Sequence, residues 1–332
     1  MRTIITALTL GSFQRFSFLA TLSFCAALGA ATVGSAPAYA EGTSRWGANL
    51  GTGRFFSNDF LGDNKDRWRS GAYTVSKLRG PLGLTGLPTQ FGTLNELRFA
   101  TQIIAPANLG TADPTDRPYV GMASLGVHSH AVKRGVEMRV GLDLVATGPS
   151  TGIGDFHSWV HDALGATPPS DAVLGRQIAD HIYPTASLEV ARPYALDTKI
   201  LGHVTLRPFV NAQAGVESFV RIGGDILIGA AFSQGVLLRD EVTGQLYQGL
   251  NTDPAKGLSF LLGADVAHMF DSQLLRASDG VTLTKTRTRA RAGLKWQGER
   301  VGVFYGVTYL GREFEAQPEG QIVGSLSLKL DF

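Results

Sequence analysis

The chain has 332 residues, of which 17% are charged and 44% hydrophobic, and its formal net charge is +2. Such a balanced charge offers no argument for nucleic acid, and we expect no nucleic-acid partner. The single cysteine, Cys25, lies in a segment that we expect to be removed, so disulfides and thiolate metal sites are excluded from the mature chain.

Residues 1–40 have the features of a secretory signal peptide. Arg2 and Arg15 precede an apolar run over 16–31, and small residues lead to an A-x-A cleavage site that ends at Ala40. A membrane-spanning anchor fits less well, because the apolar core is short and diluted by serine and threonine. The remainder, 41–332, contains no linker or internal repeat, so we expect one domain.

Period-two alternation of apolar and polar residues dominates the mature chain. In the last strand, Leu326, Leu328 and Phe332 alternate with serines and charged residues, which places one face in apolar surroundings and the other in water. The same pattern predicts twelve strands, at 44–56, 68–79, 93–105, 118–130, 135–147, 184–195, 200–213, 218–230, 258–269, 280–294, 299–311 and 321–332. Because a membrane admits only helices and closed barrels, we predict an all-β fold, a transmembrane antiparallel β-barrel of about 12 strands in the outer membrane.

The parity of the strands assigns the loops to the two sides of the membrane. With the N-terminus in the periplasm, the connections 57–67, 106–117 and 148–183 lie outside the cell, and 231–257 lies in the periplasm without a comparable polar cluster. The third outer loop contains GDFHSWVHDALGAT, which predicts a short helix with His157 and His161 on one face.

The polar residues of the first and third loops could support ester hydrolysis. Such a site needs a general base, for which His157 or His161 is available, and a positive group for the oxyanion. Asp59, with Asn58, could hold a calcium ion. Plain solvation of these loop residues is the commoner situation. A zinc-protease motif is excluded, because Ser158 stands where H-E-x-x-H requires glutamate.

Several motifs in chain order resemble the outer-membrane lipid A 3'-O-deacylase family, the LpxR type. They are SNDF (57–60), DRWRSG (66–71), DRPYVGM (116–122), GPSTGIGDFHSWVHDALGA (148–166), GRQIAD (175–180) and the ending at 312–332. The resemblance implies a twelve-stranded barrel with its site at the outer rim, where histidine activates a water and a calcium ion stabilises the oxyanion.

The resemblance also assigns roles to individual residues. It makes His161 the base, and Asn58 and Asp59 the catalytic Asn-Asp pair. Ser70 replaces a functional threonine of the family, and Asp59 with backbone oxygen near Ser70 is expected to bind Ca2+. His157 stands where the family commonly has glutamine, so we interpret it as an orienting neighbour, and the histidines not as a metal pair.

Thr167 is the main departure from the family, which has a glutamate at this metal-binding position. The loss of a carboxylate should weaken calcium binding, and Asp155, Asp162 and Asp171 are the candidates to compensate.

Basic residues of the rim offer a second possible link to the substrate. Arg67, Arg69 and Arg117 could bind lipid A phosphates, or could have a structural role only.

We therefore expect an esterase that removes the 3'-linked acyl group of lipid A, with lipopolysaccharide as its partner. The alternative is a catalytically degenerate family member that acts as a lipopolysaccharide-binding or structural barrel. A porin is less favoured, because side chains and loops can largely fill a barrel of this width.

Overall fold

The computed structural model describes residues 47–233, 235–250 and 255–330. The predicted signal peptide, 1–40, and the terminal Phe332 lie outside these residues. None of the helices in the described part of the chain has the length and apolar character needed to cross a membrane.

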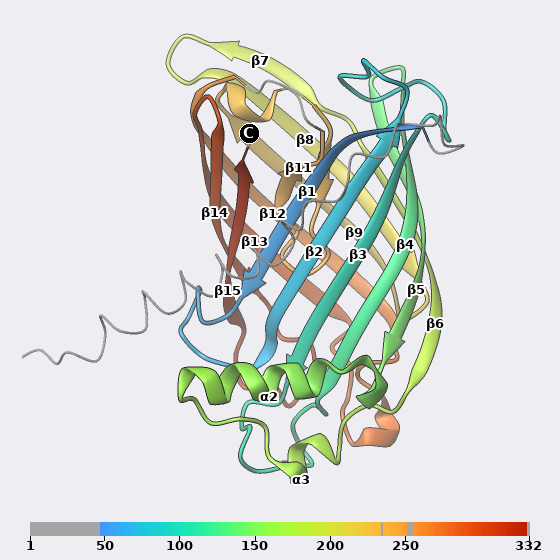
Figure 1. Cartoon of the computed structure of the whole chain (residues 1–332), viewed down its shortest axis with the longest axis vertical. Coiled ribbons are helices and arrows are strands. Elements are labelled where there is room, and N and C mark those ends of the chain that lie inside the picture. The colour runs from blue at the N-terminus through green and yellow to red at the C-terminus, as the bar shows by residue number, and fades with distance from the viewer. Residues whose placement is uncertain (1–46, 234, 251–254, 331–332) are drawn as a thin grey trace, which may run out of the picture.

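A closed antiparallel barrel forms the body of the molecule (Figure 1). The main sheet has thirteen strands, but β7 (Tyr194–Thr198) pairs only with β8, and the other twelve form a ring that the β6–β8 pairing closes. These twelve strands are β1 (Ala48–Asn58), β2 (Trp68–Gly80), β3 (Leu94–Ala105), β4 (Val120–Lys133), β5 (Val136–Thr147), β6 (His181–Ala191), β8 (Gly202–Ala214), β9 (Glu217–Ile228), β12 (Gly257–Ser272), β13 (Thr286–Gln297), β14 (Val301–Leu310) and β15 (Gln321–Leu330). The predicted twelve-stranded barrel is confirmed.

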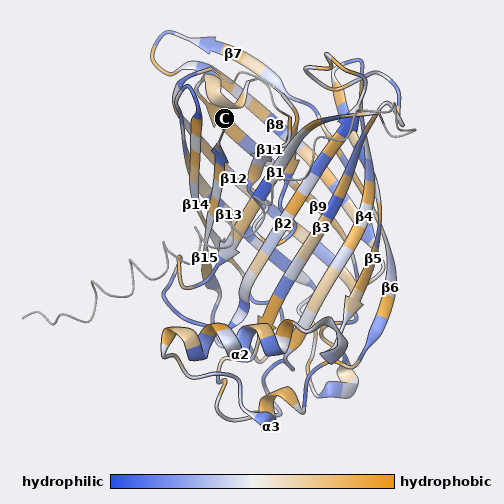
Figure 2. Cartoon of the chain, in the orientation of Figure 1, coloured by the Kyte–Doolittle hydropathy of each residue, from blue (hydrophilic) through white to orange (hydrophobic). Residues whose placement is uncertain are grey.

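The two faces of the wall have the polarity that the alternation predicts (Figure 2). In β3, Leu97 and Phe99 point outward and are each 45% exposed, whereas Glu96 and Arg98 point into the lumen and are buried. Apolar side chains outside and ion pairs inside are the arrangement that a lipid environment requires of a barrel.

The long connection between β9 and β12, which parity assigns to the periplasm, turns back into the barrel. It carries a hairpin, β10 (Leu237–Arg239) and β11 (Leu246–Gln248), which lies inside the barrel. The Tyr247 ring stacks on Phe55 of β1 at 5.2 Å. Arg239 pairs with Glu189 at 3.0 Å and with Asp225 at 2.8 Å, so the hairpin is bound to several strands of the wall.

Short helices occupy the connections. The helix α2 (Ile153–Leu164) lies across the rim where β1 ends and β2 begins, and α3 (Asp171–Leu174) follows it beyond the same rim (Figure 1). Three 3-10 turns are η1 (Pro149–Thr151), η2 (Ala230–Phe232) and η3 (Ala277–Asp279). Parity assigns the rim with α2 and α3 to the cell exterior.

Candidate active site at the outer rim

The first loop is folded tightly against the start of β2. The Asp59 N–H donates to the Ser70 carbonyl at 3.1 Å, and the Asn58 side chain accepts from the Phe60 N–H at 2.9 Å. The pairing of β2 with β3 is irregular between Arg69 and Gly71, and this bulge allows the Ser70 hydroxyl to donate to Asp66 Oδ1. Bulges of this kind re-aim side chains beside functional sites.

The third loop supplies the two histidines from α2. Spacing of four residues puts both rings on one face, and their centroids are 4.4 Å apart. The helix ends at Leu164 and is capped by Gly165, whose φ of 67° is the left-handed conformation that favours glycine. The reversal brings the Thr167 carbonyl oxygen to 2.6 Å from His161 Nδ1.

A close approach fixes the position of α2 on the wall. Gly121 of β4 lies under the residues that lead into the helix, and a Cβ atom there would be 2.9 Å from both Ile153 Cβ and Thr151 Oγ1. Only a residue without a side chain allows the helix to pack this close to β4.

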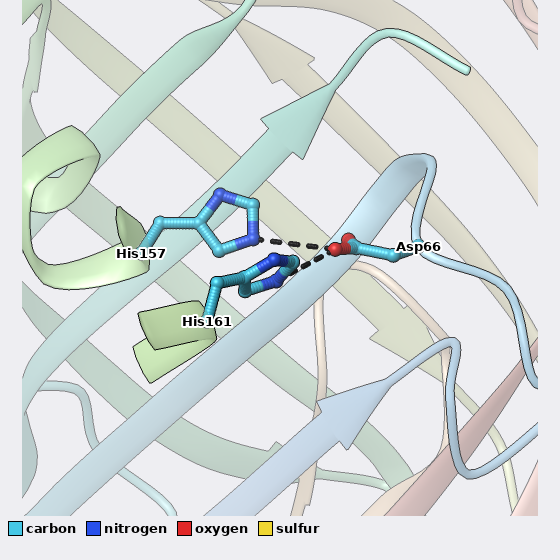
Figure 3. A group of neighbouring side chains, drawn as sticks. All are labelled: Asp66, His157 and His161. Atoms are coloured by element: carbon cyan, nitrogen blue, oxygen red, sulfur yellow. Dashed lines mark ion pairs between the residues drawn. The ribbon is translucent and has the colours of Figure 1, made fainter. Parts of the chain in front are cut away.

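Asp66 joins the two loops at the centre of the site (Figure 3). Its Oδ2 atom lies 2.7 Å from His161 Nε2 and 3.5 Å from His157 Nε2. His157 is the deeper histidine: its Nδ1 atom is 3.2 Å from the Tyr119 hydroxyl, and the two rings stack with centroids 5.9 Å apart. The side chains of Asp66 and His161 are 29% and 12% exposed, so the site opens to its surroundings at these two residues.

The electrostatics of Asp66 and His161 favour an ion pair. Burial would raise the pKa of the Asp66 carboxyl, but hydrogen bonds with His157 and His161 hold it well below its usual range. The hydrogen bond with Asp66 in turn raises the pKa of His161 above its ordinary value. In the absence of substrate, His161 is therefore stabilised as an imidazolium.

Asp59 has the properties of a cation ligand. Its Oδ2 atom accepts from the Arg67 N–H at 2.7 Å, while its buried Oδ1 atom has no hydrogen-bond partner among the residues that the structure describes. Burial, followed by the negative charge of Asp66, raises the pKa of Asp59 well above its usual value. A bound cation would satisfy the free oxygen and offset both effects, so the residues fit a calcium ion.

The structure brings Asn58, Asp59, Ser70 and His161 to one rim, as the sequence predicts. Thr167 reaches the site through its carbonyl oxygen, which contacts His161; its role in metal binding stays a prediction.

The structure also shows which acidic residue faces His161. Asp155, Asp162 and Asp171 are exposed, and the carboxylate that pairs with His161 is Asp66 from the other loop. The sequence alone does not assign a role to Asp66 or Tyr119, although Asp66 lies in the DRWRSG motif and Tyr119 in the DRPYVGM motif.

The three arginines considered as phosphate ligands are all paired with carboxylates of the chain. Arg67 pairs with Glu319 at 2.9 Å, and Arg69 and Arg117 both pair with Glu313. All three are buried, so their contacts support a structural role rather than binding of lipid A phosphates.

Comparisons with known proteins agree with this architecture. A family model described as "Outer membrane protein LpxR" matches residues 22–332. A search of curated proteins finds no match. Among solved structures, LpxR from Salmonella typhimurium aligns with a TM-score of 0.67 and 16% identity, over 85% of this chain and 99% of its own.

Two other barrels align less well. The β domain of the Bordetella autotransporter Brka has a TM-score of 0.42 and 9% identity, over 86% of this chain and 100% of its own. The NanC porin has a TM-score of 0.36 and 7% identity, over 85% of this chain and 99% of its own. Because the family model spans nearly the whole chain, this protein belongs to the LpxR family of outer membrane proteins.

Proposed function

We propose that the protein is a calcium-dependent ester hydrolase that removes the 3'-linked acyl group of lipid A in the outer leaflet. One observation carries the proposal: His161 is held between two outer loops, paired with Asp66 and with the Thr167 carbonyl, and the loop that supplies Asp66 also carries Asp59, whose Oδ1 atom has no hydrogen-bond partner among the described residues. Family membership and the apolar outer wall support a lipid substrate.

His161 is the general base of this proposal. Its Nδ1–H donates to the Thr167 carbonyl, so Nε2, which lies 2.7 Å from Asp66 Oδ2, is the ring nitrogen that can accept a proton. A water molecule that takes the place of Asp66 at Nε2 loses its proton to Nε2 as its oxygen attacks the ester carbonyl carbon. Nε2 then returns the proton to the departing 3' oxygen of the sugar, and the products are a free fatty acid and the deacylated sugar. Asp66 stabilises the imidazolium between these steps.

Asp59, together with Asn58 and the Ser70 carbonyl, would hold the calcium ion. When bound, calcium polarises the ester carbonyl and stabilises the tetrahedral oxyanion. The buried Asp59 Oδ1 atom, which lacks a hydrogen-bond partner among the described residues, is the support for this assignment.

The outward face of α2 suits a lipid substrate. Phe156, Trp159 and Leu164 are exposed on the helix that carries both histidines. Exposed apolar side chains at a membrane rim favour contact with acyl chains, so a lipid ester can reach His161 without leaving the membrane.

A lipopolysaccharide-binding barrel without activity is the second candidate. It is favoured by the position of Thr167: this residue stands where the family has a glutamate, and the carboxylates in the described part of the third loop are exposed. This reading predicts binding of lipid A without release of fatty acid.

Mass spectrometry of lipid A after incubation with the purified protein in detergent tests both candidates. The enzyme should release the 3' acyl chain in the presence of calcium. Replacement of a general base typically lowers the rate by about 10²- to 10⁴-fold, which we expect for His161→Ala. His157→Ala should retain part of the activity, and His203→Ala, an exposed histidine paired with Asp197, serves as control. Intact lipid A at every calcium concentration would support the binding barrel, and a larger loss in His157→Ala would exclude His161 as the base.

A further inference from the structure

We propose that Asp66, His157 and His161 form a Zn2+ site, and that zinc bound there inhibits the hydrolase by occupying His161 Nε2. The binding site stands on geometry alone, while the inhibition rests on the proposed function. The three residues offer one donor atom each, and these atoms all lie within 4.8 Å of one another. They come from two separate loops, which Figure 3 shows converging on one point.

The spacing of the donors fits a tetrahedral ion. Zinc–nitrogen and zinc–oxygen bonds of about 2.0–2.1 Å place neighbouring ligands of a tetrahedron about 3.3 Å apart. Asp66 Oδ2 is 3.5 Å from His157 Nε2 and 2.7 Å from His161 Nε2. Zinc binding requires that His161 and Asp66 separate by a few tenths of an ångström and that His161 Nε2 releases its proton. It also requires that the two histidine nitrogens, which lie within 4.8 Å of each other, adjust to the same ion.

The groups around the donors are arranged as in metal sites. His161 Nδ1 lies 2.6 Å from the Thr167 carbonyl, an acceptor that keeps the proton on Nδ1 and leaves the Nε2 lone pair for a ligand. His157 Nδ1 is 3.2 Å from the Tyr119 hydroxyl oxygen, which can accept a hydrogen bond from Nδ1–H and so leave the Nε2 lone pair for a ligand. The Ser70 hydroxyl donates to Asp66 Oδ1, so Oδ2 is the carboxylate oxygen that faces the histidines.

The donor set discriminates zinc from calcium. Two imidazole nitrogens and one carboxylate oxygen suit Zn2+, whereas Ca2+ takes six to eight oxygen ligands. Calcium is therefore assigned to the Asp59 side of the site, and zinc to the Asp66 side. Three protein ligands leave a fourth position, which opens to the surroundings through the exposed parts of Asp66 and His161.

The position of the ion gives it an inhibitory effect. A zinc ion on His161 Nε2 uses the lone pair that must accept the proton of the attacking water, so the zinc-bound protein lacks its base. His161 and Asp66 alone provide two zinc ligands, and His157 provides the third. Replacement of His157 should therefore weaken zinc binding more than it lowers the deacylation rate.

Direct binding measurements test the site without reference to activity. Full-length mature protein in detergent micelles, stripped with chelator, is titrated with Zn2+ by calorimetry and with Co2+ as an absorption probe. We expect one ion per chain and the intense visible bands of four-coordinate cobalt. His157→Gln and Asp66→Asn should weaken binding at least tenfold, by an order-of-magnitude comparison with outer-shell substitutions.

His203→Gln is the matched control, since it removes a histidine that also pairs with an aspartate, Asp197, but lies outside the cluster. It should bind zinc as the wild type does. Failure of the wild type to bind zinc stoichiometrically, or equal binding by the wild type and His157→Gln, would overturn the site.

Deacylation at increasing zinc, with calcium held constant, tests the inhibition. We expect loss of wild-type activity at the concentration that fills the site. Zinc that binds an active enzyme without slowing it would overturn the inhibition. A protein that binds zinc but never deacylates lipid A would refute the proposed function and leave the metal site standing, and an active enzyme that binds no zinc would do the reverse.

Discussion

Gly121→Ala should displace α2 and lower catalysis with little loss of the barrel. The added Cβ would lie 2.9 Å from Ile153 Cβ, whereas ordinary contacts begin at 3.4 Å, so the helix must move by the difference of 0.5 Å. A misplacement of 1 Å at a catalytic group can lower the rate about 100-fold, so half that shift corresponds to roughly tenfold. The expected result is a drop of about tenfold in kcat/KM.

The assay is the deacylation rate of lipid A in mixed micelles, with heat-induced unfolding measured on the same samples. Gly86→Ala is the control, because a Cβ at Gly86 meets nothing within 4 Å. Full activity of Gly121→Ala would refute the reasoning that contact with β4 sets the position of the histidines. Equal losses in both variants would show that the glycines act through general backbone effects.

Three further predictions concern charge. Asp66→Asn removes the hydrogen bond that raises the pKa of His161. In the proposed mechanism the neutral imidazole is the base, so the acid limb of the plot of kcat/KM against pH should move to lower pH. An unmoved acid limb would exclude Asp66 as the partner of His161 during turnover. Thr167→Glu adds a negative charge at the residue that contacts His161, so activity should saturate at lower calcium than in the wild type. Activity that survives chelation in both proteins would remove calcium from the mechanism. Arg239→Met leaves the buried carboxylates of Glu189 and Asp225 with one partner fewer. It should lower the free energy of unfolding by about 3 kcal/mol, measured in urea titrations. An unchanged urea midpoint would show that the hairpin is not held by these ion pairs.

The barrel could be predicted because alternation is a local signal. Each strand shows its two faces within a few residues, as Leu97 and Glu96 do, and closure follows from the need to pair every edge in a membrane. The hairpin inside the barrel escaped prediction because β10 and β11 have three residues each, too few to show a period. The predicted strand 280–294 begins too early, since β13 begins at Thr286. Leu283 instead forms an isolated bridge with Phe314 of another loop, a long-range contact that the local sequence does not show.

The site was predicted in part for reasons of the same kind. His161 could be located because a helix face and a motif both mark it. Asp66 could not be distinguished from Asp59 and Asp63, since its direction depends on the bulge at Ser70. The contact of Thr167 with His161 is made by its backbone carbonyl, which any residue type would provide, and the metal-binding role of Thr167 stays a prediction. Arg117 and Glu313, 196 residues apart, have no sequence pattern that would pair them.

The hairpin in the lumen separates two tasks that a membrane barrel could otherwise combine. An outer membrane protects the cell only while its proteins do not leak, and an abundant enzyme with an open bore would expose the cell to small toxic solutes. Here the chain's own segment, bound through Arg239 to β6 and β9, occupies the bore. A cell could therefore carry many copies of this protein and alter its surface lipids while its barrier to antibiotics and detergents is maintained.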